Sequence, residues 1–235
     1  YYFLTGVAYF QMYQWDKAIT ELEKALKTDL KLNSKPGWSQ SYAWLVWAYI
    51  RTGQYMKGKK LLDKSEKYFP EDWELTMQKT IISLEEGDTI AAGRHIEKFI
   101  SILKDNSASE EIIAANLAEI YSDANILDKA EGYYRQALSL GPETPGRLRI
   151  LAFFLIDKER NINEGMDLVV QYLKLKPENY FILDTKGWGL YKQGKYKEAL
   201  EILQKSWDLR RQKAVYDHTA FLHLQDARKA VAAQK

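Results

Sequence analysis

The sequence predicts an all-α fold, an α-α superhelix built as a solenoid of antiparallel helix pairs. Three observations lead to this prediction. Apolar residues recur with helical spacing along the chain, no segment alternates strictly between apolar and polar residues as a half-buried strand would, and only five prolines interrupt the 235 residues. The predicted helices are short and come in pairs, so we expect a helical repeat.

The second predicted pair is the clearest. Its first helix carries apolar side chains on one face, at positions i, i+3, i+4 and i+7: Tyr42, Leu45, Val46 and Tyr49. Gly53 follows, and a glycine can take the left-handed conformation that ends a helix. Pro70 closes the unit, because proline has no N–H with which to continue the second helix. The same order of signals returns closer to the C-terminus, which predicts a repeated unit.

The repeat has a measurable period. A small residue stands early in the second helix of each predicted pair: Ala18, Gly58, Ala92, Ala130, Gly165 and Ala199. The intervals between these positions are 40, 34, 38, 35 and 34 residues. A unit of 34 residues with insertions of six, four and one residues therefore accounts for all five intervals.

This pattern resembles the tetratricopeptide repeat, W-x2-L-G-x2-Y, then A-x3-F, then P. The resemblance covers about residues 1–211, and the last repeat, with Gly187-Trp188-Gly189-Leu190-Tyr191 before Ala199, is similar to those of bacterial tetratricopeptide-repeat proteins. It implies six hairpins, at about 1–30, 39–70, 71–104, 108–142, 144–177 and 178–211. The polar outer positions of residues 212–235 predict a C-terminal capping helix, which such a stack needs at its end.

Composition argues against two classes of partner. The chain has 34 basic and 32 acidic residues, so it lacks the basic excess that neutralises a nucleic-acid backbone. No apolar run reaches about 18 residues, so we expect no membrane-spanning segment. Aromatic residues are numerous (16 Tyr, 7 Trp and 8 Phe), and they can supply either a core or a binding surface.

The sequence carries no recognisable catalytic constellation. Cysteine is absent, which excludes disulfides and thiolate metal sites. His95, His218 and His223 are the only bases that titrate near neutral pH, and the last two are five residues apart, which does not place them on one helical face. We therefore predict that the chain is not an enzyme and uses no cofactor and no metal.

The chain starts inside structure. Tyr1 to Leu4 already predict a helix, and no initiator Met precedes them. We therefore expect the natural N-terminus to lie upstream, together with any targeting signal. The sequence indicates no compartment, because a bacterial cytoplasm and a bacterial periplasm agree with it equally well.

The resemblance implies that the first helix of each pair lines an inner, concave surface. On that surface we expect an apolar, aromatic stripe with flanking charges, a pattern typical of sites for extended peptides and amphipathic helices. The predicted groove residues are Val7, Trp47, Ile50, Arg51, Ile81, Phe154, Lys158, Trp188, Tyr191 and Lys192. A protein or peptide is therefore the expected partner.

Two alternatives stay open. The chain could be a structural assembly or dimerisation module, a homodimer included, whose groove is covered by its own residues. It could also be the non-catalytic helper domain of a larger protein. The clamp with which related repeats hold acidic C-terminal tails is disfavoured, because Met77 and Ile81 stand where its leading Lys and Asn belong.

Overall fold

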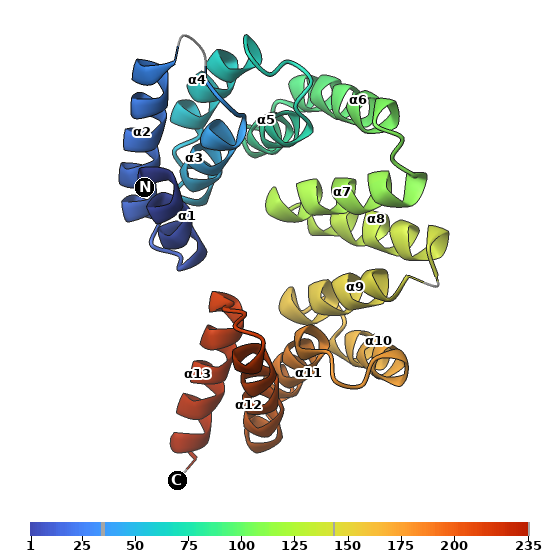
Figure 1. The fold of residues 1–235 in the computed structure, drawn as a ribbon. Coiled ribbons are helices and arrows are strands. Elements are labelled where there is room, and N and C mark those ends of the chain that lie inside the picture. Colours follow the sequence, from blue (N-terminus) through green and yellow to red (C-terminus); the bar gives the residue numbers. More distant parts are fainter. Residues whose placement is uncertain (34–35, 143, 235) are drawn as a thin grey trace. The chain divides into compact units, whose positions relative to one another are not determined.

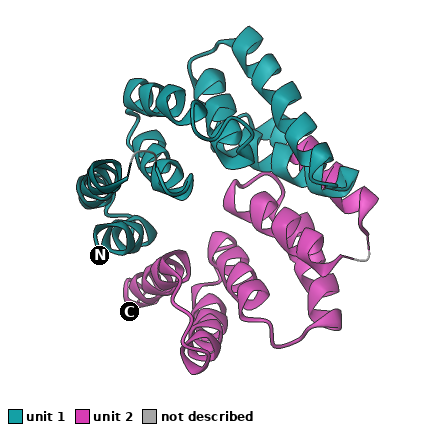
Figure 2. Cartoon of the chain, turned by 45° about the horizontal axis from the view of Figure 1, so that its top comes forward, with its two compact units in different colours: residues 1–130 teal, residues 131–235 magenta. Residues whose placement is uncertain are grey.

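The structure, a computed structural model, describes residues 1–33, 36–142 and 144–234. These residues form thirteen α-helices and no strand, so the fold is an all-α helical repeat (Figure 1). They divide into two compact units, residues 1–130 and residues 131–235, coloured separately in Figure 2. We describe each unit by itself.

Unit 1 consists of helix pairs that follow one another along the chain. Its helices are α1 (Tyr2–Gln11), α2 (Trp15–Leu32), α3 (Gln40–Arg51), α4 (Tyr55–Glu66), α5 (Trp73–Glu85), α6 (Thr89–Asp105) and α7 (Glu110–Asp123). Each of the first three pairs packs against itself, and the first helices also contact one another in the order α1, α3, α5, α7. One side of unit 1 is therefore built from first helices only.

Unit 2 continues the same arrangement. The helix α8 (Leu127–Leu140) contains the boundary between the units. The remaining helices are α9 (Pro145–Asp157), α10 (Ile162–Leu175), α11 (Tyr180–Lys192), α12 (Tyr196–Gln212) and α13 (His218–Ala232). The first helices α9 and α11 contact each other, and α13 packs on both α11 and α12.

Local chemistry explains where many of these helices begin and end. At six helices a side-chain oxygen of the N-cap residue accepts a hydrogen bond from a backbone N–H of the first turn. These N-cap residues are Asp72, Asp88, Ser109, Asn161, Asn179 and Asp217. Gly53 has a φ of 68° at the turn between α3 and α4, the left-handed conformation that the sequence predicts there.

Small residues set how closely the helices of a pair approach. A Cβ on Gly187 would lie 2.5 Å from Cγ of Leu203, and a Cβ on Gly6 would lie 2.6 Å from Cγ of Leu22. Both leucines are almost completely buried. A glycine in the first helix therefore receives a leucine of the second helix in the first and the last pair of the chain.

The predicted capping helix corresponds to α13, which begins at His218 and not at residue 212. Asp217 caps it by accepting the N–H of Ala220, and this bond places its start. Lys235, the last residue of the predicted range, lies outside the described residues. Within the described ranges, none of the helices combines the length and the apolarity needed to cross a membrane.

Candidate functional site

A pocket of about 300 Å³ lies on the first-helix side of unit 1. The helices α1, α3, α5 and α7 all contribute to it. Its lining residues are Phe10, Trp44, Trp47, Arg51, Trp73, Glu74, Met77, Glu119 and Asp123. We call it the aromatic pocket, because four of its nine lining side chains are aromatic.

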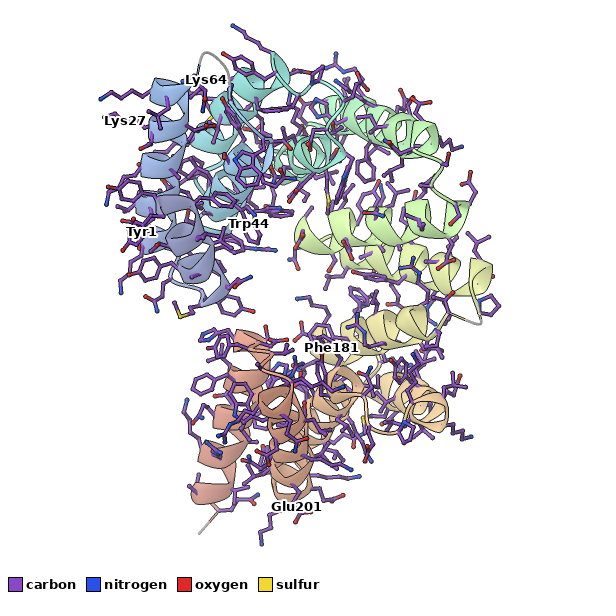
Figure 3. All side chains as sticks on the ribbon, viewed as in Figure 1. Tyr1, Lys27, Trp44, Lys64, Phe181 and Glu201 are labelled. Atoms are coloured by element: carbon purple, nitrogen blue, oxygen red, sulfur yellow. The ribbon has the colours of Figure 1, made fainter. Side chains whose placement is uncertain are left out.

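The aromatic residues come from three different helices. Phe10 of α1 and Trp44 of α3 meet edge to face, with ring centres 5.1 Å apart. Trp44, labelled in Figure 3, and Trp47 are both half-buried. Trp73, at the start of α5, is 44% exposed. An exposed tryptophan beside half-buried ones is a surface on which another molecule can bury large apolar area.

Polar contacts of Trp47 connect three helices of the pocket. Its indole Nε1–H donates to Oε1 of Glu74 at 3.1 Å. The guanidinium of Arg51 lies 5.3 Å from the centre of the Trp47 ring system. The same guanidinium donates through Nη2 to Oδ1 of Asp123 at 2.9 Å. These contacts hold the side chains of α3, α5 and α7 in one arrangement before any partner arrives.

The ionised form of the Glu74 carboxyl group is disfavoured at its position in the aromatic pocket. Burial raises its pKa above the ordinary value, and the nearby charge of Asp72 raises it further. The hydrogen bond from Trp47 acts in the opposite direction and stabilises the charged form. Burial is the largest of these effects, so the ionised Glu74 is poorly compensated by its own protein.

The structure places the predicted groove residues of unit 1 at different depths. Trp47 and Arg51 line the aromatic pocket, and Val7 is half-buried on α1. Ile50 and Ile81 are buried, Ile81 completely. The helix α5 packs against α3, α6 and α7, and these contacts leave Ile81 no exposed surface. We therefore leave Ile50 and Ile81 out of the proposed binding surface.

In unit 2, the predicted residue Trp188 is occupied by contacts within the chain. His223 of α13 stacks on its ring with centres 4.1 Å apart and planes at 10°. Tyr191 stacks on it at 4.8 Å, and the ammonium of Lys192 lies 5.0 Å from the ring centre. The Nε1–H of Trp188 donates to Asp157 at 3.3 Å. Trp188 is thus partly covered by the C-terminal helix.

The other predicted residues of unit 2 also lie in contacts of their own. Phe154 is buried and its ring centre is 4.9 Å from that of Tyr134. Lys158 is exposed and pairs with Asp157 at 3.1 Å. Lys192 pairs with Glu159 as well as lying on the indole. We leave Phe154 out of the proposed surface because it is part of the core.

Seven of the nine pocket residues are absent from the predicted groove set: Phe10, Trp44, Trp73, Glu74, Met77, Glu119 and Asp123. A spacing signal was present for Trp44, Trp73 and Glu74, because Trp44 lies three residues before Trp47, and Trp73 and Glu74 lie four and three residues before Met77. Residues at these spacings share a helical face. The hydrogen bond of Glu74 to the indole of Trp47 in another hairpin could not be predicted from this spacing.

Each of the three histidines lies within hydrogen-bond distance of another side chain. Nδ1 of His218 lies 2.7 Å from the hydroxyl oxygen of Tyr216. Nδ1 of His95 lies 3.2 Å from Oγ of Ser83, and burial lowers the pKa of this histidine. Nδ1 of His223 lies 3.0 Å from Oδ2 of Asp184. In the part of the chain that the structure describes, no cluster of three or more His, Asp or Glu side chains is arranged to hold a metal ion.

Comparison with known proteins identifies the repeat. Tetratricopeptide-repeat family models match residues 1–29 and residues 182–220, which correspond to the first pair and to the last pair with the start of α13. The first and the last helix pair of the chain thus each match the tetratricopeptide repeat. A curated tetratricopeptide-repeat relative, TPR repeat-containing protein PA4667 of Pseudomonas aeruginosa, is 30% identical over 82 residues, which is 35% of this chain. The match spans only 14% of that relative's length.

Two solved structures resemble the fold. Yeast Tom70 superposes with a TM-score of 0.55 at 19% identity, covering 95% of this chain and 47% of that one. A chain in the crystal structure of the APC/C hetero-tetramer Cut9–Hcn1 gives a TM-score of 0.50 at 15% identity, and the match covers 93% of this chain and 40% of that one. At these identities the likeness establishes the fold alone.

Proposed function

We propose that this chain is a protein-interaction scaffold that binds a polypeptide segment in the aromatic pocket of unit 1. Tetratricopeptide repeats typically serve as such scaffolds. The observation that carries the proposal is the exposed Trp73 beside Trp44 and Trp47 in a pocket of about 300 Å³. Tryptophan in a partly desolvated pocket is the residue type that most often dominates binding energy.

The proposed binding site is smaller than the predicted groove and lies in the aromatic pocket of unit 1 alone. Trp47 and Arg51 stay in it, and Trp44, Trp73 and Phe10 join them. Trp188 does not, because His223 already stacks on its ring. One alternative considered from the sequence is a groove covered by the chain's own residues. Such coverage is present at Trp188, where His223 stacks on the ring, whereas Trp73 is 44% exposed.

We also propose that the scaffold is non-catalytic. Cysteine is absent from the sequence, and each histidine has a hydrogen-bond partner that its local packing explains. The buried pair of His223 and Asp184 has Trp188 stacked on the imidazole, which leaves that ring face no room for a substrate. The polar contacts of the aromatic pocket tie helices together and present no nucleophile beside a base.

Substitution of the pocket tryptophans tests the proposal. Peptides would be selected from a random dodecapeptide library on the immobilised full chain, and the affinity of each selected peptide measured by fluorescence anisotropy. We expect Trp73→Ala to weaken binding at least about tenfold, because a binding hot spot typically contributes about 2 kcal/mol or more. Trp47→Ala should weaken it as well.

The matched control is Trp38→Ala. Trp38 is also in unit 1 and is 56% exposed, but it stacks on Phe3 and does not line the pocket. We expect this variant to bind within about twofold of the parent chain. Selected peptides that bind the Trp73 and Trp38 variants equally well would contradict the proposal. Light scattering of the unliganded chain would show whether a second copy competes for the same surface.

A further inference from the structure

We propose that the aromatic pocket recognises an arginine side chain of the bound segment. This inference rests on the proposed function and specifies the chemistry of its partner. Three lines of observation lead to it: the charge of the pocket lining, the position of Arg51, and the way in which unit 2 fills the corresponding surroundings of Trp188.

The pocket lining is acidic. Three of its residues carry carboxylates, Glu74, Glu119 and Asp123, and a single guanidinium, that of Arg51, faces them. Arg51 donates to Asp123. The lining thus contains three carboxylates, from α5 and α7, and one cation. The chain as a whole has a formal charge of +2, so this acidic lining is a local feature. A cation entering the pocket would therefore be attracted to it.

The pocket already holds one cation in the geometry that a second would use. The guanidinium of Arg51 lies over the Trp47 ring at 5.3 Å and reaches Asp123 at 2.9 Å. An aromatic face on one side and a carboxylate on the other is the environment in which a guanidinium gains from both interactions. Trp73 and Glu74, adjacent in α5, bring the same two group types to the pocket lining, and Trp73 is 44% exposed.

In unit 2, the surroundings of Trp188 resemble those of Trp47 and contain a stacked side chain. Trp188 and Lys192 repeat the i, i+4 pair of Trp47 and Arg51, and the indole of Trp188 also donates to a carboxylate, Asp157. There, the planar basic ring of His223 stacks on the indole at 4.1 Å and bonds to a carboxylate of α11. A planar nitrogen base from α13 thus fills this place in unit 2.

The aromatic pocket of unit 1 has no such ring among its lining residues. Of the planar nitrogen-containing side chains that a partner polypeptide can supply, arginine is the one that stays cationic at neutral pH, whereas histidine is mostly neutral there. The arginine guanidinium stacks on indole and bonds to carboxylates through a rigid fork, whereas the lysine ammonium is a compact, strongly hydrated charge. The raised pKa of Glu74 agrees with this, because a cation beside that carboxylate would relieve the unfavourable charge.

The test uses the full chain labelled with 5-fluorotryptophan, with the ¹⁹F signals of Trp47 and Trp73 assigned by Trp→Phe variants. The probes are the N-acetyl methylamides of arginine, of citrulline, which is its uncharged isostere, and of lysine. We expect the arginine probe to shift both signals saturably at millimolar concentration. Citrulline should leave them unchanged, and lysine should bind at least about threefold more weakly than arginine.

Two substitutions of opposite expected sign separate charge recognition from a structural effect. Glu119→Gln should weaken binding of the arginine probe about threefold to tenfold, because it removes one attracting carboxylate. Arg51→Gln should strengthen it about threefold, because it removes the competing cation and frees Asp123. Glu110→Gln is the control, since Glu110 lies on α7, pairs with Lys104 and does not line the pocket.

Equal shifts with arginine and citrulline, or no shift with either, would overturn the inference, as would weaker binding in both the Glu119 and the Arg51 variants. The proposed function fails in a different way. Some selected dodecapeptides could bind through Trp73 and still tolerate replacement of every arginine by citrulline. That result would support peptide binding in the aromatic pocket and contradict the recognition of arginine. Peptides indifferent to Trp73→Ala would refute the pocket itself.

Discussion

Glu74 lines the proposed binding pocket and also affects the stability of the fold. Its carboxylate accepts the indole N–H of Trp47 but is raised in pKa by burial. A carboxyl group whose pKa is higher in the folded than in the unfolded chain binds more protons when folded. Stability therefore falls as the pH rises from the unfolded pKa through the folded one, and the ionised form is destabilising above that range. A destabilising charge of this kind is typical of functional sites, which agrees with the proposed role of Glu74 in binding.

We therefore expect Glu74→Gln to raise the free energy of unfolding at pH 7. The amide oxygen can still accept the hydrogen bond from Trp47, while the unfavourable charge is gone. The gain should shrink on acidification and vanish below about pH 4, where the parent carboxyl is protonated in both states. Urea unfolding followed by circular dichroism between pH 3 and pH 7.5 measures it.

The exposed Glu71 of the same segment supplies the control variant, Glu71→Gln, which should show no comparable gain. A Glu74→Gln variant that is less stable than the parent at pH 7 would show that the carboxylate is better compensated than the structure indicates.

At the scale of the element, the close approach of two helices depends on glycine in the first helix. A Cβ on Gly187 of α11 would lie 2.5 Å from Cγ and 3.2 Å from the backbone nitrogen of Leu203 in α12. Backbone atoms of a packed helix cannot move aside without shifting the whole helix. Glycine is otherwise unfavourable inside a helix, so its presence here reflects packing and not helix propensity.

Gly187→Ala is expected to lower the free energy of unfolding by about 1–3 kcal/mol, because it overpacks the interface of α11 and α12. Gly132→Ala in α8 is the matched substitution, since a Cβ there would meet nothing within 4 Å. It should raise stability by about 0.5–1 kcal/mol through helix propensity alone. Thermal and urea unfolding of both variants measure the opposite signs, and equal effects would refute the packing argument.

At the scale of the whole molecule, contacts run between neighbouring helices within two compact units. In such a repeat, stability is approximately a sum of local contributions, and a disturbance stays near its origin. Leu22 in unit 1 and Leu203 in unit 2 occupy equivalent positions, each about 1% exposed and each facing a glycine of the preceding helix.

We expect Leu203→Ala to destabilise the protein by about 2–5 kcal/mol and to accelerate amide hydrogen exchange in α11, α12 and α13. Exchange in α1 to α4 should stay at the parent rate. Leu22→Ala should give the converse pattern. Hydrogen-exchange mass spectrometry resolves the helices, and faster exchange throughout the chain in either variant would show that the chain unfolds as one cooperative body.

The sequence by itself determined the all-α class and the paired helices, because both depend on interactions between residues a few positions apart. The face of Tyr42 and Tyr49 and the left-handed turn at Gly53 are local features of this kind. The proposed binding surface could be predicted only in part. Trp47 and Arg51 were expected there, but an offset within one helix does not say which neighbouring helix lies over a side chain.

Only the tertiary structure decided which inner residues stay accessible. Arg51 bonds to Asp123, 72 residues further along the chain, and Ile81 is fully buried while Trp73 is 44% exposed. His223 covers the ring of Trp188 from α13. Contacts of this kind depend on how successive hairpins pack, and the spacing within a repeat carries no information about that packing.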